Sequence, residues 1–177
     1  ELAALRDMTV VLLGAGTLGA PIARELAKAQ LGELIIVEPD FADAGPIVRW
    51  DLGMRSVGMS KGRALQADLK ADYPYTNTTV VSLSVGNTFA GRGPGTKDRL
   101  EAALYGADLI IDATAEWNIR EVVAAYATEA TLPVITVWSI EGYGGVVSIA
   151  RPGDDACCYC RELWLSPETG AVDLPTG

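Results

Sequence analysis

Histidine is missing from this sequence altogether, and that absence excludes several kinds of chemistry. Without an imidazole, the chain cannot use histidine as a general base, form a Ser-His-Asp triad, or build a metal site that needs a histidine ligand. Cysteine is scarce as well. The three cysteines stand at positions 157, 158 and 160, too close together to link distant parts of a fold. Such cysteine usage suits a reducing compartment, and we predict a cytoplasmic protein.

Basic residues and long apolar runs are also few. The chain has 14 Lys and Arg against 23 Asp and Glu, a net charge of −9, which argues against nucleic acid or an anionic membrane as a partner. No apolar run reaches the ~18 residues of a membrane span, and the opening ELAALRD lacks the features of a secretory signal. We expect a single domain over residues 1–177 that is a piece of a longer chain, since the first residue is not Met.

What the sequence does contain is a regular alternation of apolar strand patterns and helical patterns. Strands are predicted near 8–13, 34–37, 78–85, 107–112 and 132–137, with one more at 143–150, and helices near 21–30, 64–71, 100–105 and 118–130. This alternation predicts an α/β fold: a Rossmann-like, doubly wound, mostly parallel sheet with helices on both faces. In such folds the ligand binds at the carboxyl edge of the strands.

A glycine turn follows the first predicted strand. Gly14, Gly16 and Gly19 enclose Ala15, Thr17 and Leu18, and a helical pattern with Pro21 in its first turn comes next. Glycines let backbone amides approach a phosphate, and the helix N-terminus adds partial positive charge. The alternative is a plain strand-to-helix turn without a ligand. The strand-turn-helix context favours phosphate binding.

Acidic residues come at the ends of neighbouring predicted strands. Glu38 closes the second strand about 20 residues after the turn, where a Rossmann-type fold holds ribose hydroxyls. Asp40 and Asp112 are expected at the same edge of the sheet. The alternative for Glu38 is a solvated carboxylate without a ligand.

Two basic residues stand between the second and third predicted strands. Lys61 follows Ser60 at the start of a predicted helix, where a cation is unfavourable for the helix dipole and therefore invites an anion. Considered alone, Arg49 and Lys61 are more often ordinary surface charges than site residues.

The cysteine cluster contains one Cys-x-x-Cys pair, Cys157 with Cys160. Two thiolates at that spacing can supply half of a tetrahedral zinc site, although no further Cys or His follows before Gly177. Inert thiols and a redox pair are the alternatives.

Taken together, these motifs resemble the ThiF/MoeB/HesA family of ubiquitin-activating-like adenylyltransferases, over nearly the whole chain. In that family GxGxLG is followed by D-x-D, N-x-x-R, V-G-x-x-K, D-x-T-D and Cys-x-x-Cys. The corresponding segments here, in the same order and at similar spacing, are 14–19, 38–40, 46–49, 57–61, 112–115 and 157–160. The GAGTLG turn and the Arg-Trp-Asp segment at 49–51 resemble bacterial members linked to ubiquitin-conjugating or isopeptidase-like domains.

The resemblance implies ATP- and Mg²⁺-dependent adenylation of the C-terminal carboxylate of a ubiquitin-like or sulfur-carrier protein, by a homodimer. It assigns the nucleotide phosphates to the glycine turn, the ribose to Glu38, and neutralisation of the phosphates to Arg49 and Lys61. Physically, a carboxylate that attacks an α-phosphate brings two anions together, so fixed cations and positioning are the main contributions a protein can make.

Three departures from the family pattern bear on this prediction. Pro46 replaces the Asn of N-x-x-R, which removes a side-chain donor. Ala115 replaces the second Asp of D-x-T-D, to which the resemblance assigns the magnesium ion, and leaves Asp112 or Glu116 as the oxygen donors nearby. Residues 161–177 contain no acceptor cysteine.

Two other functions therefore stay open. An NAD(P)-dependent oxidoreductase would share the turn and the acidic residue, but it would explain neither Arg49 nor Lys61. A non-catalytic scaffold, which keeps the fold and binds nucleotide without turnover, would explain Pro46 and Ala115.

Overall fold

A computed structural model describes residues 2–85, 96–140 and 144–153. In this part of the chain, six strands form one sheet in the order β3-β2-β1-β4-β5-β6. The strands are β1 (Thr9–Leu13), β2 (Glu33–Val37), β3 (Asn77–Val81), β4 (Leu109–Asp112), β5 (Val134–Ile140) and β6 (Gly144–Ala150). Neighbouring strands are parallel from β3 to β5, and β6 runs antiparallel to β5. The predicted mostly parallel sheet is confirmed.

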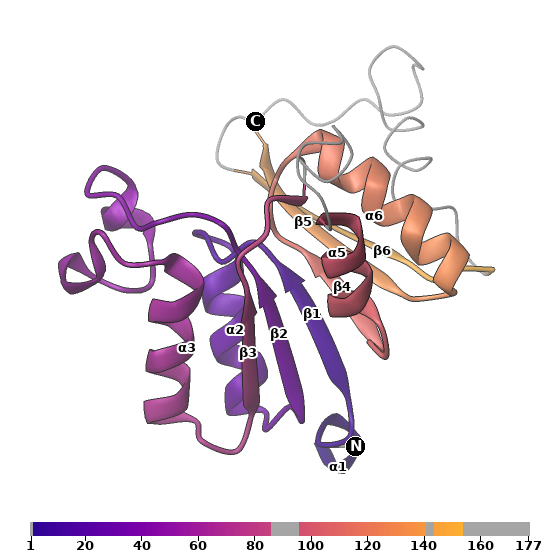
Figure 1. Cartoon of the computed structure of the whole chain (residues 1–177), viewed down its shortest axis with the longest axis horizontal. Coiled ribbons are helices and arrows are strands. Elements are labelled where there is room, and N and C mark those ends of the chain that lie inside the picture. The colour runs from indigo at the N-terminus through magenta and orange to yellow at the C-terminus, as the bar shows by residue number, and fades with distance from the viewer. Residues whose placement is uncertain (1, 86–95, 141–143, 154–177) are drawn as a thin grey trace.

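Helices cover both faces of this sheet, as predicted. The helices are α1 (Leu2–Leu5), α2 (Gly19–Lys28), α3 (Lys61–Asp72), α5 (Thr96–Leu104) and α6 (Trp117–Ala130), and two short 3-10 turns, η1 (Pro46–Arg49) and η2 (Met54–Ser56), lie between β2 and α3. Figure 1 shows α2 and α3 together beside β1, β2 and β3, with α5 and α6 on the opposite side. Among the described residues, no helix combines the length and apolar character needed to cross a bilayer.

Alternate residues of the central strand β1 supply two separate cores. Val10 and Leu12 belong to the core under α2 and α3, whereas Val11 and Leu13 belong to the core under α5 and α6. All four side chains are at most 1% exposed. A strand buried on both faces needs a continuous apolar sequence, which is why Met8–Leu13 carries no polar alternation.

The observed strands all differ by one or more residues from the predicted ranges, and the third and fifth strands differ most, for reasons of pairing. The third strand was expected to reach Val85 but ends at Val81, because its partner β2 ends at Val37, opposite Val81. The strand expected at 132–137 instead runs from Val134 to Ile140, since the antiparallel β6 pairs with its last residues.

The central strands end level with one another, which positions the site. Leu13 at the end of β1 is opposite Val37 of β2 on one side and Asp112 of β4 on the other. The glycine turn, Glu38 and Ala113 therefore follow the strands at the same carboxyl edge of the sheet. This is the edge at which we predict the ligand.

Candidate functional site

The glycine turn fits tightly against the end of the sheet at two of its glycines. Gly14 has φ +86°, a left-handed conformation that favours glycine, and its N–H donates to the carbonyl of Val37 at 3.0 Å. A Cβ on Gly19 would lie 1.9 Å from the carbonyl oxygen of Gly14. Only glycine at position 19 lets α2 begin this close to the end of β1.

The buried carboxylate of Glu38 binds the glycine turn through hydrogen bonds. Its Oε2 accepts a hydrogen bond from the N–H of Ala15 at 2.7 Å, and its Oε1 accepts one from the N–H of Asp40 at 2.9 Å. The side chain is 4% exposed, and a buried carboxylate requires such donors. Each oxygen has a second acceptor position, so two backbone contacts leave capacity for hydroxyl donors.

Lys61 stands at the first residue of α3, and Ser60 caps that helix by accepting from the N–H of Arg63. The Lys61 ammonium lies 3.1 Å from Oδ2 of Asp40, and its side chain is 19% exposed against 64% for Asp40. An exposed ion pair of this kind is weak, so an anion with more charge than one carboxylate can compete for the ammonium.

Two cavities meet at Lys61 and Gly16. The larger, of about 220 Å³, is lined by Gly14, Gly16, Val37, Glu38, Pro39, Asp40, Lys61, Leu83, Ser84, Val85, Ala113, Thr114, Glu116 and Ile119. The smaller, of about 40 Å³, is lined by Gly16, Thr17, Ala42, Asp43, Pro46, Ile47, Trp50 and Lys61 and has no room for a nucleoside. A nucleoside therefore fits only the larger of these two cavities, where apolar walls accompany Glu38 and Lys61.

Asp112 lies behind the site and is fully buried. Its Oδ1 accepts hydrogen bonds from the N–H of Thr114 at 3.0 Å and from the Thr114 hydroxyl at 2.6 Å. Its Oδ2 has no hydrogen-bond partner among the described residues. Burial raises the pKa of the Asp112 carboxyl, and the Thr114 hydrogen bonds and the nearby charge of Arg120 only partly oppose this rise.

This raised pKa makes the stability of the protein depend on pH. The folded state binds the Asp112 proton more tightly than the unfolded state does, so the contribution is fully present below the ordinary aspartate value of 3.8 and is lost as pH rises through the folded pKa. Asp112→Asn, which is never charged, should thus unfold like wild type at pH 3 and be more stable by about 1 kcal/mol at pH 7. Thermal denaturation at both pH values measures the difference. Asp7→Asn, at an exposed carboxylate, is the control, and an advantage of Asp112→Asn that does not grow with pH would contradict the expectation.

The structure brings half of the predicted site residues to the two cavities. Gly14, Gly16, Glu38, Asp40 and Lys61 line the larger cavity, and Gly16, Thr17 and Lys61 line the smaller one. Leu18 is the N-cap of α2, and Gly19 is the first residue of that helix.

Besides Leu18 and Gly19, four predicted residues lie apart from these cavities or outside the described residues. Arg49 is exposed at the end of η1 and lines neither cavity, and Asp112 lines neither as well. Cys157 and Cys160 lie outside the described residues, so the zinc half-site stays a prediction. Within the described residues, no group of three or more His, Cys, Asp or Glu side chains could hold a metal.

Trp50 is one of the site residues that the sequence patterns do not indicate. Its indole Nε1 donates to the carbonyl of Ala15 at 2.7 Å, and its side chain is buried against the turn. The tryptophan directly follows Arg49 in the sequence, but no local pattern indicates a contact with a residue 35 positions away. The apolar lining of Leu83, Val85 and Ile119 was missed for the same reason.

Known proteins are similar to this chain in sequence and in fold. The profile of the ThiF family matches residues 1–174. The uncharacterized protein y4oA of Sinorhizobium fredii is 32% identical over 98% of this chain and 30% of its own length. The sulfur carrier protein ThiS adenylyltransferase of Escherichia coli is 27% identical over 90% of this chain and 59% of its own length.

Among solved structures, E. coli MccB with ATP superposes with a TM-score of 0.74 at 19% identity, covering 96% of this chain and 48% of MccB, a likeness that concerns the fold alone. The chain spans about a third of the length of y4oA and of y4qC, a second S. fredii protein. Because the family profile covers almost every residue, the chain belongs to the ThiF family.

Proposed function

We propose that this chain binds ATP at the carboxyl edge of its sheet and adenylates the C-terminal carboxylate of a ubiquitin-like or sulfur-carrier protein. The observation that carries the proposal is the convergence of the glycine turn, Glu38 and Lys61 on one cavity large enough for a nucleoside. Relatives in the ThiF family support it, since two of them are named as a ThiS adenylyltransferase and a molybdopterin-synthase adenylyltransferase. This favours adenylation over the oxidoreductase alternative.

In the proposed reaction, a carboxylate oxygen of the carrier attacks the α-phosphorus of ATP. One carboxyl O–P bond forms, the bond between the α-phosphorus and the bridging oxygen breaks, and pyrophosphate leaves with the electron pair of that bond. No proton is transferred in this step, which agrees with a chain that lacks histidine. Charge stabilisation and alignment then account for the rate.

The residues of the site divide this work between them. Free backbone donors of the glycine turn contact the phosphates, and the remaining acceptor positions of Glu38 take the ribose hydroxyls. Lys61 exchanges Asp40 for a phosphate and neutralises part of its charge. Arg49, exposed on η1, is assigned to the phosphates by its place in the family motif.

Magnesium and zinc enter this proposal on different grounds. The fully buried Asp112 has one oxygen without a hydrogen-bond partner among the described residues, and a carboxylate oxygen is a ligand that Mg²⁺ accepts. When bound with ATP, Mg²⁺ would neutralise phosphate charge, and Asp112 and Glu116 are the carboxylates near the cavity that would hold it. Zinc on Cys157 and Cys160 rests on the Cys-x-x-Cys spacing.

We also propose that the protein forms a homodimer and acts in the cytoplasm. Between β2 and α3 the chain exposes several apolar side chains, which supports a protein contact on that segment. These side chains are Phe41 at 67%, Val48 at 87% and Met54 at 65%. Sedimentation velocity of the protein would test the dimer.

Pyrophosphate exchange tests the enzymatic proposal. With Mg²⁺ and a carrier protein that has a free C-terminus, the full-length protein should exchange labelled pyrophosphate into ATP. Lys61→Ala should lower the exchange rate about 10- to 100-fold, because a fixed cation beside the reacting phosphates is lost. Arg49→Ala should also lower it. Lys70→Ala is the matched control, since Lys70 is an exposed lysine in the last turn of the same helix.

Other outcomes would decide against this proposal. A wild-type protein that does not bind ATP would refute it. Tight ATP binding without exchange would instead support the scaffold alternative that Pro46 and Ala115 raised.

A further inference from the structure

The peptide groups on both sides of Ala15 are held by side chains from other parts of the chain. Glu38 accepts the N–H of Ala15 at 2.7 Å, and Trp50 donates to its carbonyl at 2.7 Å. Ala15 is fully buried and the Trp50 side chain is 9% exposed, so neither contact competes with bulk water. Hydrogen bonds in such surroundings fix an orientation more firmly than exposed ones.

The contact with Trp50 determines where the next amide points. A trans peptide is planar, so its N–H points opposite to its C=O. The carbonyl of Ala15 and the N–H of Gly16 belong to the same peptide group. Because that carbonyl points toward the indole of Trp50, the Gly16 N–H points away from it. Gly16 lines both cavities, and its N–H donates to no acceptor among the described residues.

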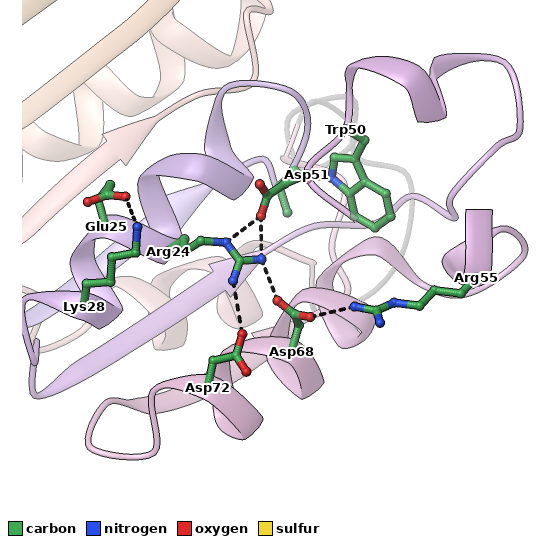
Figure 2. Close-up of polar contacts among 9 residues, drawn as sticks. Arg24, Glu25, Lys28, Trp50, Asp51, Arg55, Asp68 and Asp72 are labelled. Carbon is green, nitrogen blue, oxygen red and sulfur yellow. Dashed lines mark hydrogen bonds and ion pairs between the residues drawn. The ribbon is translucent and has the colours of Figure 1, made fainter. Parts of the chain in front are cut away.

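Asp51, the residue after Trp50, forms an ion pair with α2, the helix that begins at Gly19 of the turn. Figure 2 shows Asp51 beside Arg24 of α2, with Oδ2 of Asp51 at 2.8 Å from Nε and at 2.6 Å from Nη2 of Arg24. Arg24 also contacts Asp68 at 2.5 Å and Asp72 at 3.6 Å, both on α3. Two consecutive residues therefore bind the turn and its helix.

The carboxylates around Arg24 stabilise its charged form. Burial works against the charge on the Arg24 guanidinium, but hydrogen bonds to Asp68 and Asp51 outweigh it and raise the pKa of Arg24 above its ordinary value. Arg55 of η2 adds a further ion pair to Asp68 at 3.1 Å. The segment that carries Trp50 is thus attached to both α2 and α3.

We propose that Trp50 is a positioning residue that orients the Gly16 N–H toward the phosphates of the bound nucleotide, with the Asp51–Arg24 ion pair as its anchor. The identity of the ligand rests on the proposed function. The role of Trp50 is separate from that of Glu38, because the indole acts on the phosphate end of the ligand and has no contact with the larger cavity.

Binding of ATP and of adenosine to variants tests this role. Trp50→Phe keeps an aromatic ring but removes the indole N–H, so the dissociation constant of Mg·ATP measured by calorimetry should rise about fivefold. That of adenosine, which has no phosphate, should stay within about twofold of wild type. Trp138→Phe is the matched control: Trp138 lies on β5 under Arg120 and lines neither cavity, so both constants should be unchanged.

Each alternative result has a defined meaning. An equal loss of ATP and adenosine affinity, or no loss of ATP affinity, would overturn the inference. If Trp50→Phe does not fold, Asp51→Asn replaces it, and the same ATP-selective loss supports the role whereas an equal loss overturns it.

A further readout separates this inference from the proposed function. If wild type binds neither ligand, the proposed function fails, and the amide spectrum of the ligand-free protein then decides about Trp50. A displaced Gly16 amide resonance in Trp50→Phe, absent in Trp138→Phe, would support the positioning role, and an unmoved one would overturn it.

Discussion

Replacing Glu38 with alanine is expected to lower the free energy of unfolding by about 3 kcal/mol, because a charged acceptor with two hydrogen bonds is lost. The N–H of Ala15 is fully buried and would remain without an acceptor, whereas the N–H of Asp40, in an exposed residue, can bind water. Removing the desolvated carboxylate offsets only part of this cost. Urea denaturation at neutral pH measures the loss.

Two further variants, one at the start of β2 and one at position 38 itself, show whether the hydrogen bonds are responsible. Glu33→Ala, at the partly exposed start of β2, should change stability by less than about 0.5 kcal/mol. Glu38→Gln keeps one carbonyl acceptor for Ala15 and should lose clearly less than Glu38→Ala. Equal losses in the two Glu38 variants would mean that the cost comes from the charge and not from the contact with the turn.

The sequence could predict those features of the site that local pattern controls. The glycine turn, the end of the second strand at Glu38 and the start of a helix at Lys61 each depend on a few adjacent residues, and the parallel topology brings their ends together. In the structure Leu13 pairs with Val37 and with Asp112, which places the predicted residues at one edge of the sheet. These predictions are confirmed as placements, whereas the roles of the residues stay predictions.

Features that depend on contacts distant in sequence could not be predicted in this way. The Trp50 hydrogen bond to Ala15 and the Arg24 network join segments that only the completed fold brings together. The position of a residue in a motif also does not tell where its side chain lies: Arg49 matches the family pattern, yet it is exposed on η1 and lines neither cavity, so its role at the phosphates stays a prediction. A motif fixes where a residue stands along the backbone, but the direction of its side chain depends on local packing.

The contacts of Ala15 also explain why the turn needs support from two sides. A glycine-rich segment has high conformational freedom when unfolded, so a defined arrangement of its amides must be imposed by its surroundings. Glu38 supplies an acceptor from the end of β2, and Trp50 supplies a donor from the segment before α3. The conformation of the turn is therefore set jointly by the end of β2 and by the segment before α3.

Gly19→Ala is expected to be the most damaging small substitution in the turn. The new Cβ would lie 1.9 Å from the carbonyl oxygen and 2.9 Å from the carbonyl carbon of Gly14, both of them backbone atoms that no rotamer change can move. The start of α2 would have to separate from the end of β1, where Ala20 and Ala23 pack in the core. We expect a loss of about 3 kcal/mol or more in the free energy of unfolding, measured by urea denaturation.

Gly16→Ala, in the same turn, is the matched control. Comparing the two variants distinguishes a glycine required for packing from a glycine required at the cavity wall. A Cβ at Gly16 meets no atom within 4 Å, and its φ lies outside the positive region, so stability should change by less than about 1 kcal/mol. The added methyl group would nevertheless stand where Gly16 lines both cavities, so ATP affinity should fall while the fold persists. Equal destabilisation by the two substitutions would show that close helix–strand contact is not what requires glycine at position 19. If the expected pattern is found, Gly19 is needed to assemble the turn, and Gly16 is needed for what the turn binds.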